Sequence, residues 1–408
     1  MRSYTKVDKL KIAHTNKYNI FGCIVREGPI NRAAIAKRTD LSLPTVMAIT
    51  GELLEKSAVC SIGKGDFGAG KPPEMFEVNP DFFYVMGVDL GRTEIRIIIN
   101  DATFRQRLCY KEPTGYPFPE EAFICRLGHI IKDLIGSLNS GQARILGAGI
   151  AMPGLIERET GRVIISPDFG WKDIPLQSRL QELLPFPALV RNSNHALALN
   201  ESALENGSDD NHVSFCVNLG YGIGAALIIG EELYAGAKGT GGELGHSVVE
   251  KGGPFCKCGN SGCLEAVASG EAIARQAAVI AAHHGDSRIA ELCGRDISKL
   301  EARMVFEAAE AGDEGARKII SNAADYIGIG LSTAVNILDP DRVILCGGLM
   351  RNGPFFFEKI RAGMEEHVMP CSGRKLKLTV GKGGEYGTAQ GVCRAFLNSF
   401  WSEQLLPI

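Results

Sequence analysis

The chain has 408 residues, of which 45% are hydrophobic and 22% are charged, so it can form two or three domains with full-sized cores. Its formal net charge of −3 at pH 7 excludes a global basic field for nucleic acid, and any such contact needs a local basic patch. The first nineteen residues form such a basic patch. Their only acidic residue is Asp8, and their basic residues are Arg2, Lys6, Lys9, Lys11 and Lys17.

The twelve cysteines do not predict disulfides. The N-terminus is polar and charged, unlike a secretory signal, and no run of about 18 apolar residues predicts a membrane span. We therefore expect a cytoplasmic protein with reduced thiols. Most cysteines stand singly and are interpreted as small buried hydrophobes, whereas Cys256, Cys258 and Cys263 are clustered.

Residues 11–57 have helical periodicity. One apolar stripe ends at Gly28-Pro29, and residues 32–38 form a short second helix. After a turn, Ser42 is the expected N-cap of a third helix with Pro44 in its first turn. Two short β-type runs, joined by a segment rich in Gly and Pro, follow this helix-turn-helix. Residues 1–79 are therefore predicted to be a winged helix-turn-helix DNA-binding domain.

The third helix is expected in the major groove, with its first residues as base readers: Ser42, Leu43, Pro44, Thr45 and Met47. This set lacks Arg, Asn and Gln for bidentate readout, so contacts with thymine methyl groups are expected. Phosphate contacts would supply much of the affinity, from Arg32, Lys37, Arg38, Lys64 and Lys71. The alternative is that this domain binds a protein.

From residue 83 onward, expected strands alternate with expected helices in two successive sets. This order predicts two α/β lobes. We place the first lobe at 80–200 and the second at 201–387, with a C-terminal helix, 388–408, that crosses back onto the first lobe.

Glycine turns join expected strands in both lobes. Asp89-Leu-Gly91 lies in the first lobe, Gly220-Tyr-Gly222-Ile-Gly224 lies in the second, and Gly347-Gly348 ends a later strand. Glycine lets backbone N–H groups approach a phosphate, and Asp89 could hold a metal ion or water. Each turn alone is also compatible with an ordinary hairpin. Their order favours two phosphate loops that face each other.

Together with Pro153-Gly154, Gly242-Glu243-Leu-Gly-His246 and Cys256-x-Cys-Gly-x-x-Gly-Cys263-x-Glu265, these turns resemble the ROK family of repressors, open reading frames and sugar kinases. The resemblance covers residues 11 to about 397 and includes the winged N-terminus of the repressor branch. It implies an α/β protein with a winged helix-turn-helix in front of a two-lobed actin-like, ribonuclease H-like ATPase (sugar kinase) fold.

A metal site is expected at His246, Cys256, Cys258 and Cys263, whose three sulfurs and one nitrogen suit a closed tetrahedral Zn²⁺ site. Three reduced cysteines in a loop are the alternative. The resemblance gives zinc a structural role, in which it fixes the loop that presents carboxylates to a sugar.

The family pattern also implies a sugar site, made of Asn192, Glu243, His246 and Glu265, with Asp168 where family members usually have Asn. His246 would bind zinc through one ring nitrogen and a sugar hydroxyl through the other. The alternative for each carboxylate is a solvated surface charge.

The catalytic side departs from the family's kinases, which carry Asn-Asp-x-Asn and use the Asp to take a proton from the attacking hydroxyl. Here the sequence is Asn192-Ser193-Asn194, and serine has no basic group at neutral pH. Arg92 and Tyr221 are bulky in loops where a polyphosphate must approach the backbone. Residues 385–391 also differ from the run of small residues that the family's kinases have there. No catalytic residue is assigned, and ATP is not expected as a cofactor.

The sequence therefore predicts a sugar-responsive transcriptional repressor of carbohydrate-metabolism genes. It would bind operator DNA as a homodimer or homotetramer, with a sugar or sugar derivative as effector. Coupling is expected to run through residues 73–80 and the N-terminal helix. Two alternatives stay open: an ATP-dependent sugar kinase with a DNA-binding appendage, and a repressor controlled by a partner protein.

Overall fold

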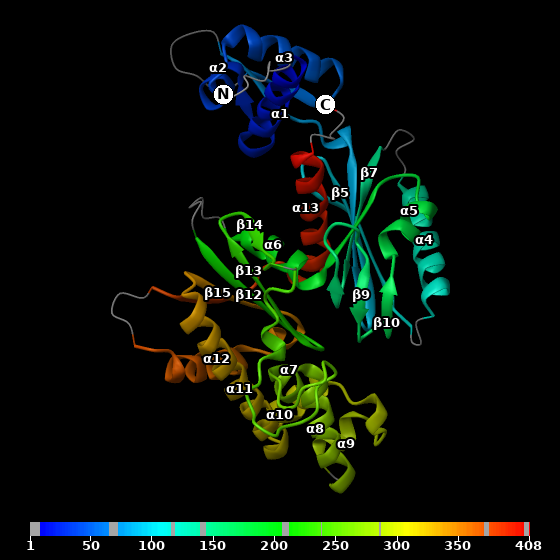
Figure 1. The fold of residues 1–408 in the computed structure, drawn as a ribbon, viewed down its shortest axis with the longest axis vertical. Helices are drawn as coiled ribbons and strands as arrows, with labels where there is room; N and C mark the ends of the chain where they lie inside the picture. Colours follow the sequence, from blue (N-terminus) through cyan, green and yellow to red (C-terminus); the bar gives the residue numbers. More distant parts are fainter. Residues whose placement is uncertain are drawn as a thin grey trace, which may run out of the picture.

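The computed structural model describes residues 9–64, 72–115, 119–138, 144–205, 212–237, 239–284, 287–370, 375–403 and 408. An N-terminal domain lies at one end of the elongated molecule against the first α/β lobe, and the helices of the second lobe form the other end (Figure 1). The predicted fold class, a winged helix-turn-helix followed by two α/β lobes, is confirmed.

The N-terminal domain contains three helices and a small sheet of order β1-β3-β2. Asp40 adopts the left-handed conformation (φ 54°) after α2, and the Ser42 side chain caps α3 as predicted. Ile35, Val46 and Leu53 are buried between the helices. The elements are α1 Lys9–Glu27, β1 Ile30–Asn31, α2 Arg32–Thr39, α3 Leu43–Glu55, β2 Val59–Lys64 and β3 Glu74–Val78.

The first lobe is built on a five-stranded sheet of order β11-β7-β4-β5-β6, with a small sheet of order β10-β9-β8 beside it. Helices α4 and α5 share one hydrophobic core with a face of the large sheet. The elements are η1 Pro80–Phe82, β4 Tyr84–Leu90, β5 Glu94–Asp101, β6 Gln106–Pro113, α4 Glu120–Ser137, β7 Ile145–Met152, β8 Leu155–Ile156, β9 Val163–Ser166, β10 Trp171–Ile174, α5 Leu176–Leu183 and β11 Ala188–Asn192.

The second lobe has a five-stranded sheet of order β14-β13-β12-β15-β16, and its helices gather on one side (Figure 1). Its elements, together with the two helices α6 and α13 that pack against each other, are α6 Ser193–Leu204, β12 Val213–Leu219, β13 Ile223–Ile229, β14 Glu232–Tyr234, η2 Leu244–His246, α7 Leu264–Ala268, α8 Gly270–His283, α9 Arg288–Leu292, η3 Ile297–Lys299, α10 Ala302–Glu310, α11 Glu314–Leu338, β15 Arg342–Cys346, η4 Gly348–Arg351, α12 Pro354–His367, β16 Lys377–Val380, η5 Gly384–Tyr386 and α13 Gly387–Ser402.

The two large sheets repeat one topology. In the first, β4 pairs antiparallel with β5 and parallel with β7. In the second, β12 pairs antiparallel with β13 and parallel with β15. The turn between β4 and β5 is therefore equivalent to the turn between β12 and β13. These are the two glycine turns singled out in the sequence.

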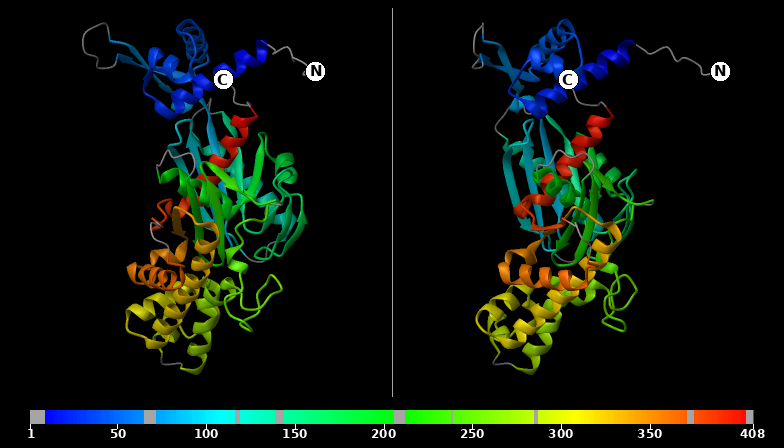
Figure 2. Two further views of the ribbon diagram at one scale, coloured as in Figure 1. Left: turned by 60° about the vertical axis from the view of Figure 1, so that its left-hand side comes forward. Right: turned by 90° about the vertical axis from the view of Figure 1, so that its left-hand side faces the viewer.

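Helix α13 returns from the second lobe to pack on the first sheet (Figure 2). The contact is backbone against backbone, because a Cβ on Gly87 of β4 would lie 2.1 Å from the carbonyl oxygen of Ala389. At the crossing of α13 with α6, a Cβ on Gly391 would lie 1.7 Å from the carbonyl oxygen of Ala196. Glycine thus permits both close approaches.

The far end of α13 lies against the N-terminal domain. The Trp401 ring stacks on Phe21 with 6.0 Å between centroids and meets Tyr18 edge-on at 5.6 Å. Beyond the helix, Lys56 Nζ donates to the carbonyl oxygen of Ile408 over 3.0 Å. One hydrophobic cluster therefore contains residues of the N-terminal domain, the first lobe and α13. This cluster is a further connection between the N-terminal domain and the first lobe, besides the expected coupling route through residues 73–80.

Within the described ranges, no helix combines the length and the apolar character needed to cross a membrane.

Gly391→Ala is expected to destabilise the protein, although alanine normally favours a helix by about 1 kcal/mol. The new methyl group would collide with the Ala196 carbonyl, and such overpacking costs roughly 1–3 kcal/mol. Urea unfolding measures the change. The control is Gly136→Ala in α4, where nothing lies within 4 Å of the added Cβ. Equal stability of the two variants would contradict this account of the crossing.

Candidate functional site

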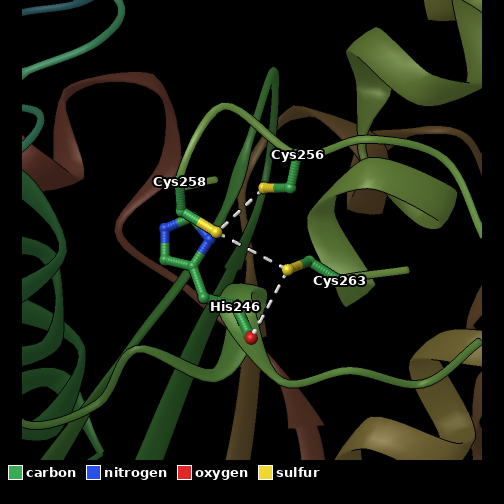
Figure 3. Close-up of side chains that lie close together, drawn as sticks. All are labelled: His246, Cys256, Cys258 and Cys263. Atoms are coloured by element: carbon green, nitrogen blue, oxygen red, sulfur yellow. Dashed lines mark hydrogen bonds between the residues drawn. The ribbon is translucent and has the colours of Figure 1, made fainter. Parts of the chain in front are cut away.

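The four predicted metal ligands converge on one point (Figure 3). One ligand atom from each of His246, Cys256, Cys258 and Cys263 lies within 4.8 Å of all the others. The sulfur of Cys256 is 3.6 Å from His246 Nδ1, and the sulfurs of Cys258 and Cys263 are 3.7 Å apart. Three sulfurs and one imidazole nitrogen at this spacing can hold a metal ion.

Glycines in the left-handed conformation shape the loop of residues 256–263, which carries the sulfurs and is named the metal loop. Gly259 has φ 100° and Gly262 has φ 75°, and a Cβ on Gly262 would lie 1.7 Å from the Glu250 carbonyl oxygen. The Cys256 amide donates to the Asn260 carbonyl over 2.8 Å, which closes the loop tip. Cys263 then stands at the N-cap position of α7, without a side-chain capping bond. The loop therefore brings the sulfurs together through its backbone conformation.

His246 presents its two ring nitrogens to different partners. Nδ1 faces the sulfur of Cys256, and Nε2 lies 3.8 Å from an oxygen of Glu243. A metal ion on Nδ1 would leave the proton on Nε2, where it can be donated toward Glu243 or a ligand. Glu243 keeps about half of its side chain exposed (50%), so its carboxylate is accessible.

Glu265 links the metal loop to the second glycine turn. Its Oε2 accepts a hydrogen bond from the Ile223 amide over 2.9 Å, and a Cβ on Gly222 would lie 2.5 Å from that oxygen. Burial raises the pKa of Glu265, while the Ile223 amide, His246 and Lys257 lower it and Asp168 raises it further. Glu265 thus lies within electrostatic range of His246 and Asp168.

Asp168 comes from the other lobe, in the turn between β9 and β10. Burial raises its pKa, and the cations of Lys257 and Arg92 oppose that shift. Asp168 therefore faces the metal loop of the second lobe and the glycine turn of the first.

Asn192 has a different position from that of the carboxylates. Its amide oxygen caps α6 by accepting from the amides of Asn194 (2.8 Å) and His195 (3.1 Å). Its Nδ2 donates to the Gly154 carbonyl over 2.8 Å. The oxygen is thus fully used, and only the second amide hydrogen is left for a ligand.

The second glycine turn is fitted closely to its own lobe. The carbonyls of Gly220 and Tyr221 accept from the amides of Gly270 (2.9 Å) and Glu271 (3.0 Å) at the start of α8. A Cβ on Gly224 would lie 1.8 Å from the side-chain nitrogen of Asn194. These first amides of α8 are therefore used within the protein rather than presented to a phosphate.

The first glycine turn carries an internal ion-pair network. Asp89 is buried, and Arg96 Nη1 lies 3.5 Å from its carboxylate. Arg96 also pairs with Glu94 and Glu385, and Lys111 Nζ lies 2.8 Å from Glu385. Burial raises the pKa of Asp89 to about 6, although Arg96 lowers it. The carboxylate expected to hold a metal ion or water has a protein cation beside it.

Three further residues at the site were not assigned roles from the sequence. His195 is hydrogen-bonded to the backbone of Gly241, and burial lowers its pKa. Lys257 and Glu271 form an ion pair of 2.8 Å. The position of Lys257 between two clustered cysteines was the only sequence signal for this pair.

The predicted DNA face is exposed at the start of α3. The Ser42 hydroxyl accepts from the Thr45 amide over 3.4 Å, Pro44 is exposed, and Leu43 and Met47 are 46% and 54% exposed. This end of the helix offers an apolar surface, consistent with the expected thymine contacts.

The predicted phosphate contacts have more varied surroundings. Arg32 donates to Thr50 and Glu74, at 2.8 Å each, and its guanidinium lies 4.4 Å from the centre of the Phe76 ring. It therefore links α2, α3 and β3 within the domain. Arg38 pairs with Glu27 at 2.9 Å. Lys71 lies outside the described residues.

The raised pKa of Asp89 gives a stability prediction. The folded state binds this proton more tightly than the unfolded chain, whose Asp pKa is about 3.9. The free energy of unfolding therefore falls as pH rises from about 4 to above 6. Between pH 4.5 and pH 7, the free energy of unfolding of Asp89→Asn should fall by roughly 2 kcal/mol less than that of the wild type. Urea unfolding at the two pH values measures this difference. The same pH dependence in both proteins would contradict the burial argument.

Comparison with known proteins agrees with this geometry. The profile of the ROK family matches residues 85–397. A putative xylose repressor of Caldicellulosiruptor sp. (strain Rt8B.4) is 31% identical over 86% of this chain and 87% of its own length. A glucokinase of Thermotoga maritima is 35% identical over 70% of this chain and 88% of its own length.

Among solved structures, a ROK family transcriptional regulator, described as a homolog of the E. coli Mlc protein, aligns with a TM-score of 0.79. The alignment covers 97% of this chain and 99% of that one at 23% identity, so it shows a shared fold along nearly the whole chain, N-terminal domain included. With the family profile matched over both lobes and a relative above 30% identity along most of its length, the chain belongs to the ROK family.

Proposed function

We propose that the chain is a sugar-responsive transcriptional repressor. Its N-terminal domain binds operator DNA, and a sugar or sugar derivative binds beside a structural Zn²⁺ site. One observation carries the proposal: the His246–Cys256–Cys258–Cys263 cluster is intact and directs His246 toward Glu243, while Ser193 stands at the position of the kinase base. The relative named a putative xylose repressor supports it over 86% of the chain.

The groups around His246 suit a polyhydroxylated ligand. His246 Nε2 supplies a donor, and Glu243, Glu265 and Asp168 supply acceptors from both lobes. Sugar hydroxyls both donate and accept, so they match such a mixed set. Burial disfavours the charged forms of Glu265 and Asp168, and a hydrogen bond from a sugar hydroxyl would stabilise those charges.

Phosphoryl transfer has little support at the same site. Ser193 cannot accept a proton without a base, and His195 beside it is engaged with Gly241. Asp89 is paired with Arg96, and the first amides of α8 hold the second glycine turn. We therefore propose that kinase activity is lost and that ATP is not a cofactor. Because a glucokinase is among the relatives, the sugar-kinase alternative is tested as well.

On the DNA side, the apolar N-terminal end of α3 would contact base methyl groups, and lysines and arginines would contact phosphates. An effector changes operator affinity only if it binds the DNA-competent and DNA-incompetent arrangements unequally. We propose that a homodimer or homotetramer binds the operator. The alternative effector is a partner protein rather than a sugar.

The purified protein is expected to carry one Zn²⁺ per chain, measured by metal analysis. Cys263→Ser should lose the ion and lower the melting temperature by roughly 5 °C or more, because a structural zinc site contributes folding free energy. Cys293→Ser is the matched control, a buried cysteine of the same lobe that lies outside the cluster. Clearly less than one zinc per chain in the wild type would remove the structural-zinc proposal.

Operator and effector binding form one experiment. Binding to promoter DNA from carbohydrate genes should weaken steeply with salt, and Met47→Lys should change the preferred sequence. In a thermal-shift screen headed by D-xylose, one sugar should raise the melting temperature and change the operator affinity. Glu243→Gln should reduce that sugar affinity by about tenfold, the effect of roughly 1.4 kcal/mol.

Two results would favour the alternatives. Sugar-dependent ADP release that Glu243→Ala abolishes would support the kinase. Intact operator binding with no thermal shift from any sugar or sugar phosphate would support control by a partner protein.

A further inference from the structure

A buried carboxylate holds the segment through which the chain returns from the second lobe to α13. This return segment, residues 381–386, follows β16. Glu201 of α6 is 2% exposed and accepts hydrogen bonds from two successive amides of the segment, Lys382 over 2.7 Å and Gly383 over 2.9 Å. A Cβ on Gly383 would lie 2.5 Å from a carboxylate oxygen of Glu201. The first half of the return segment is therefore fixed to α6.

The second half of the return segment is bound to the first lobe by ion pairs. An oxygen of Glu385 lies 2.8 Å from Lys111 Nζ on β6 and 3.7 Å from Arg96 Nε on β5. Helix α13 begins two residues later, at Gly387. These ion pairs therefore attach the start of α13 to the edge of the first sheet, at the opposite end of the helix from Trp401.

Arg96 divides its charge between the return segment and the first glycine turn. Its Nη1 lies 3.5 Å from the carboxylate of Asp89, and its Nη2 donates to Glu94. The separations from Asp89 and Glu385 both exceed the length of a charge-assisted hydrogen bond, about 2.7–2.9 Å. Among the described residues, Arg96 Nε is buried and has no hydrogen-bond partner. The guanidinium thus lies between these two carboxylates and is in close contact with neither.

The charges of this network explain why Arg96 is shared. Three carboxylates, those of Asp89, Glu94 and Glu385, face two cations, Arg96 and Lys111. Asp89 is 8% exposed, and within the described part of the chain its one ion pair is with Arg96, whereas Glu385 also has Lys111. Removal of one negative charge would let the guanidinium approach the remaining carboxylates more closely.

We propose that Asp89 and Glu385 compete for Arg96, so that the charge held at the first glycine turn sets how firmly the start of α13 is bound to the first lobe. The inference extends the proposed repressor, because the other end of α13 packs against the N-terminal domain through Trp401. A group that binds Asp89 would release Arg96 to Glu385 and fasten the helix, and an anion that binds Arg96 would loosen it. The turn that resembles a phosphate loop thereby becomes a regulatory contact.

Hydrogen–deuterium exchange in the peptide covering residues 384–391 tests this competition on the protein without sugar or DNA. Arg96→Gln should speed exchange there by about threefold, the size expected for partly exposed ion pairs. Asp89→Asn should slow exchange by a similar factor, because Arg96 is then left to Glu94 and Glu385. In the double variant Asp89→Asn/Arg96→Gln, exchange should equal that of Arg96→Gln, because Asp89 acts only through Arg96.

Glu385→Gln repeats the test and leaves the buried ion pair of Asp89 in place. It should speed exchange at residues 384–391, and the addition of Asp89→Asn should then have no effect on them. The control is Arg107→Gln. Arg107 also lies on β6 and pairs with two carboxylates, Asp81 and Asp101, neither of which belongs to the return segment. It should leave exchange at residues 384–391 unchanged.

Unchanged exchange in Asp89→Asn would overturn the competition. So would a decrease of equal size with and without Arg96, because the two carboxylates would then act independently. An increase in Arg107→Gln equal to that in Arg96→Gln would show general loosening and would also overturn it. None of these measurements involves a sugar or operator DNA, so a failure of the proposed function would leave their result standing.

Discussion

Close contact between backbones, made possible by glycine, is the constraint on which this architecture depends. Helix α13 touches the backbone of β4 at Gly87 and that of α6 at Gly391. Side chains at these positions would force the helix away from the sheet and separate the core that joins α13 to the first lobe and the N-terminal domain. The close packing of this one helix therefore holds the N-terminal domain, the first lobe and the second lobe in their order along the molecule.

The same principle operates on a smaller scale at the site. Gly222 and Gly224 leave room for the side chains of Glu265 and Asn194, so the turn is held by the metal loop on one side and by α6 on the other. A turn that resembles a phosphate loop in sequence therefore has its neighbours already in place. The metal cluster, Glu265 and the turn behave as one connected unit rather than as three motifs.

Local patterns in the sequence predicted local structure well. Ser42, Asp40 and the apolar positions of α3 define the helix-turn-helix through capping, a left-handed residue and periodicity, all of which act within a few residues. The convergence of the three clustered cysteines was predicted for the same reason, since their spacing and the glycines set the loop, whereas His246 was added from the family pattern.

Other elements were not predicted, for identifiable reasons. Strand β6 is an edge strand with no buried residue, and only Leu108 and Tyr110 of its apolar side chains pack on the core. Strand β8 has only two residues. The apolar signal of both strands is therefore short. The Glu265–Ile223 hydrogen bond joins residues more than forty positions apart, and the Asp89–Arg96 ion pair joins neighbouring strands. No spacing along the chain encodes such pairs.

The position of Trp401 on α13 has a mechanical consequence. Ten residues separate it from the crossing at Gly391, which corresponds to a lever arm of roughly 15 Å along a helix. If the crossing acts as the fulcrum, a tilt of about 4° moves the indole by about 1 Å, a large shift for a ring that stacks on Phe21 and meets Tyr18 edge-on. A rotation between the lobes too small to alter either sheet would therefore be enough to repack the core that α1 and α3 share with α13.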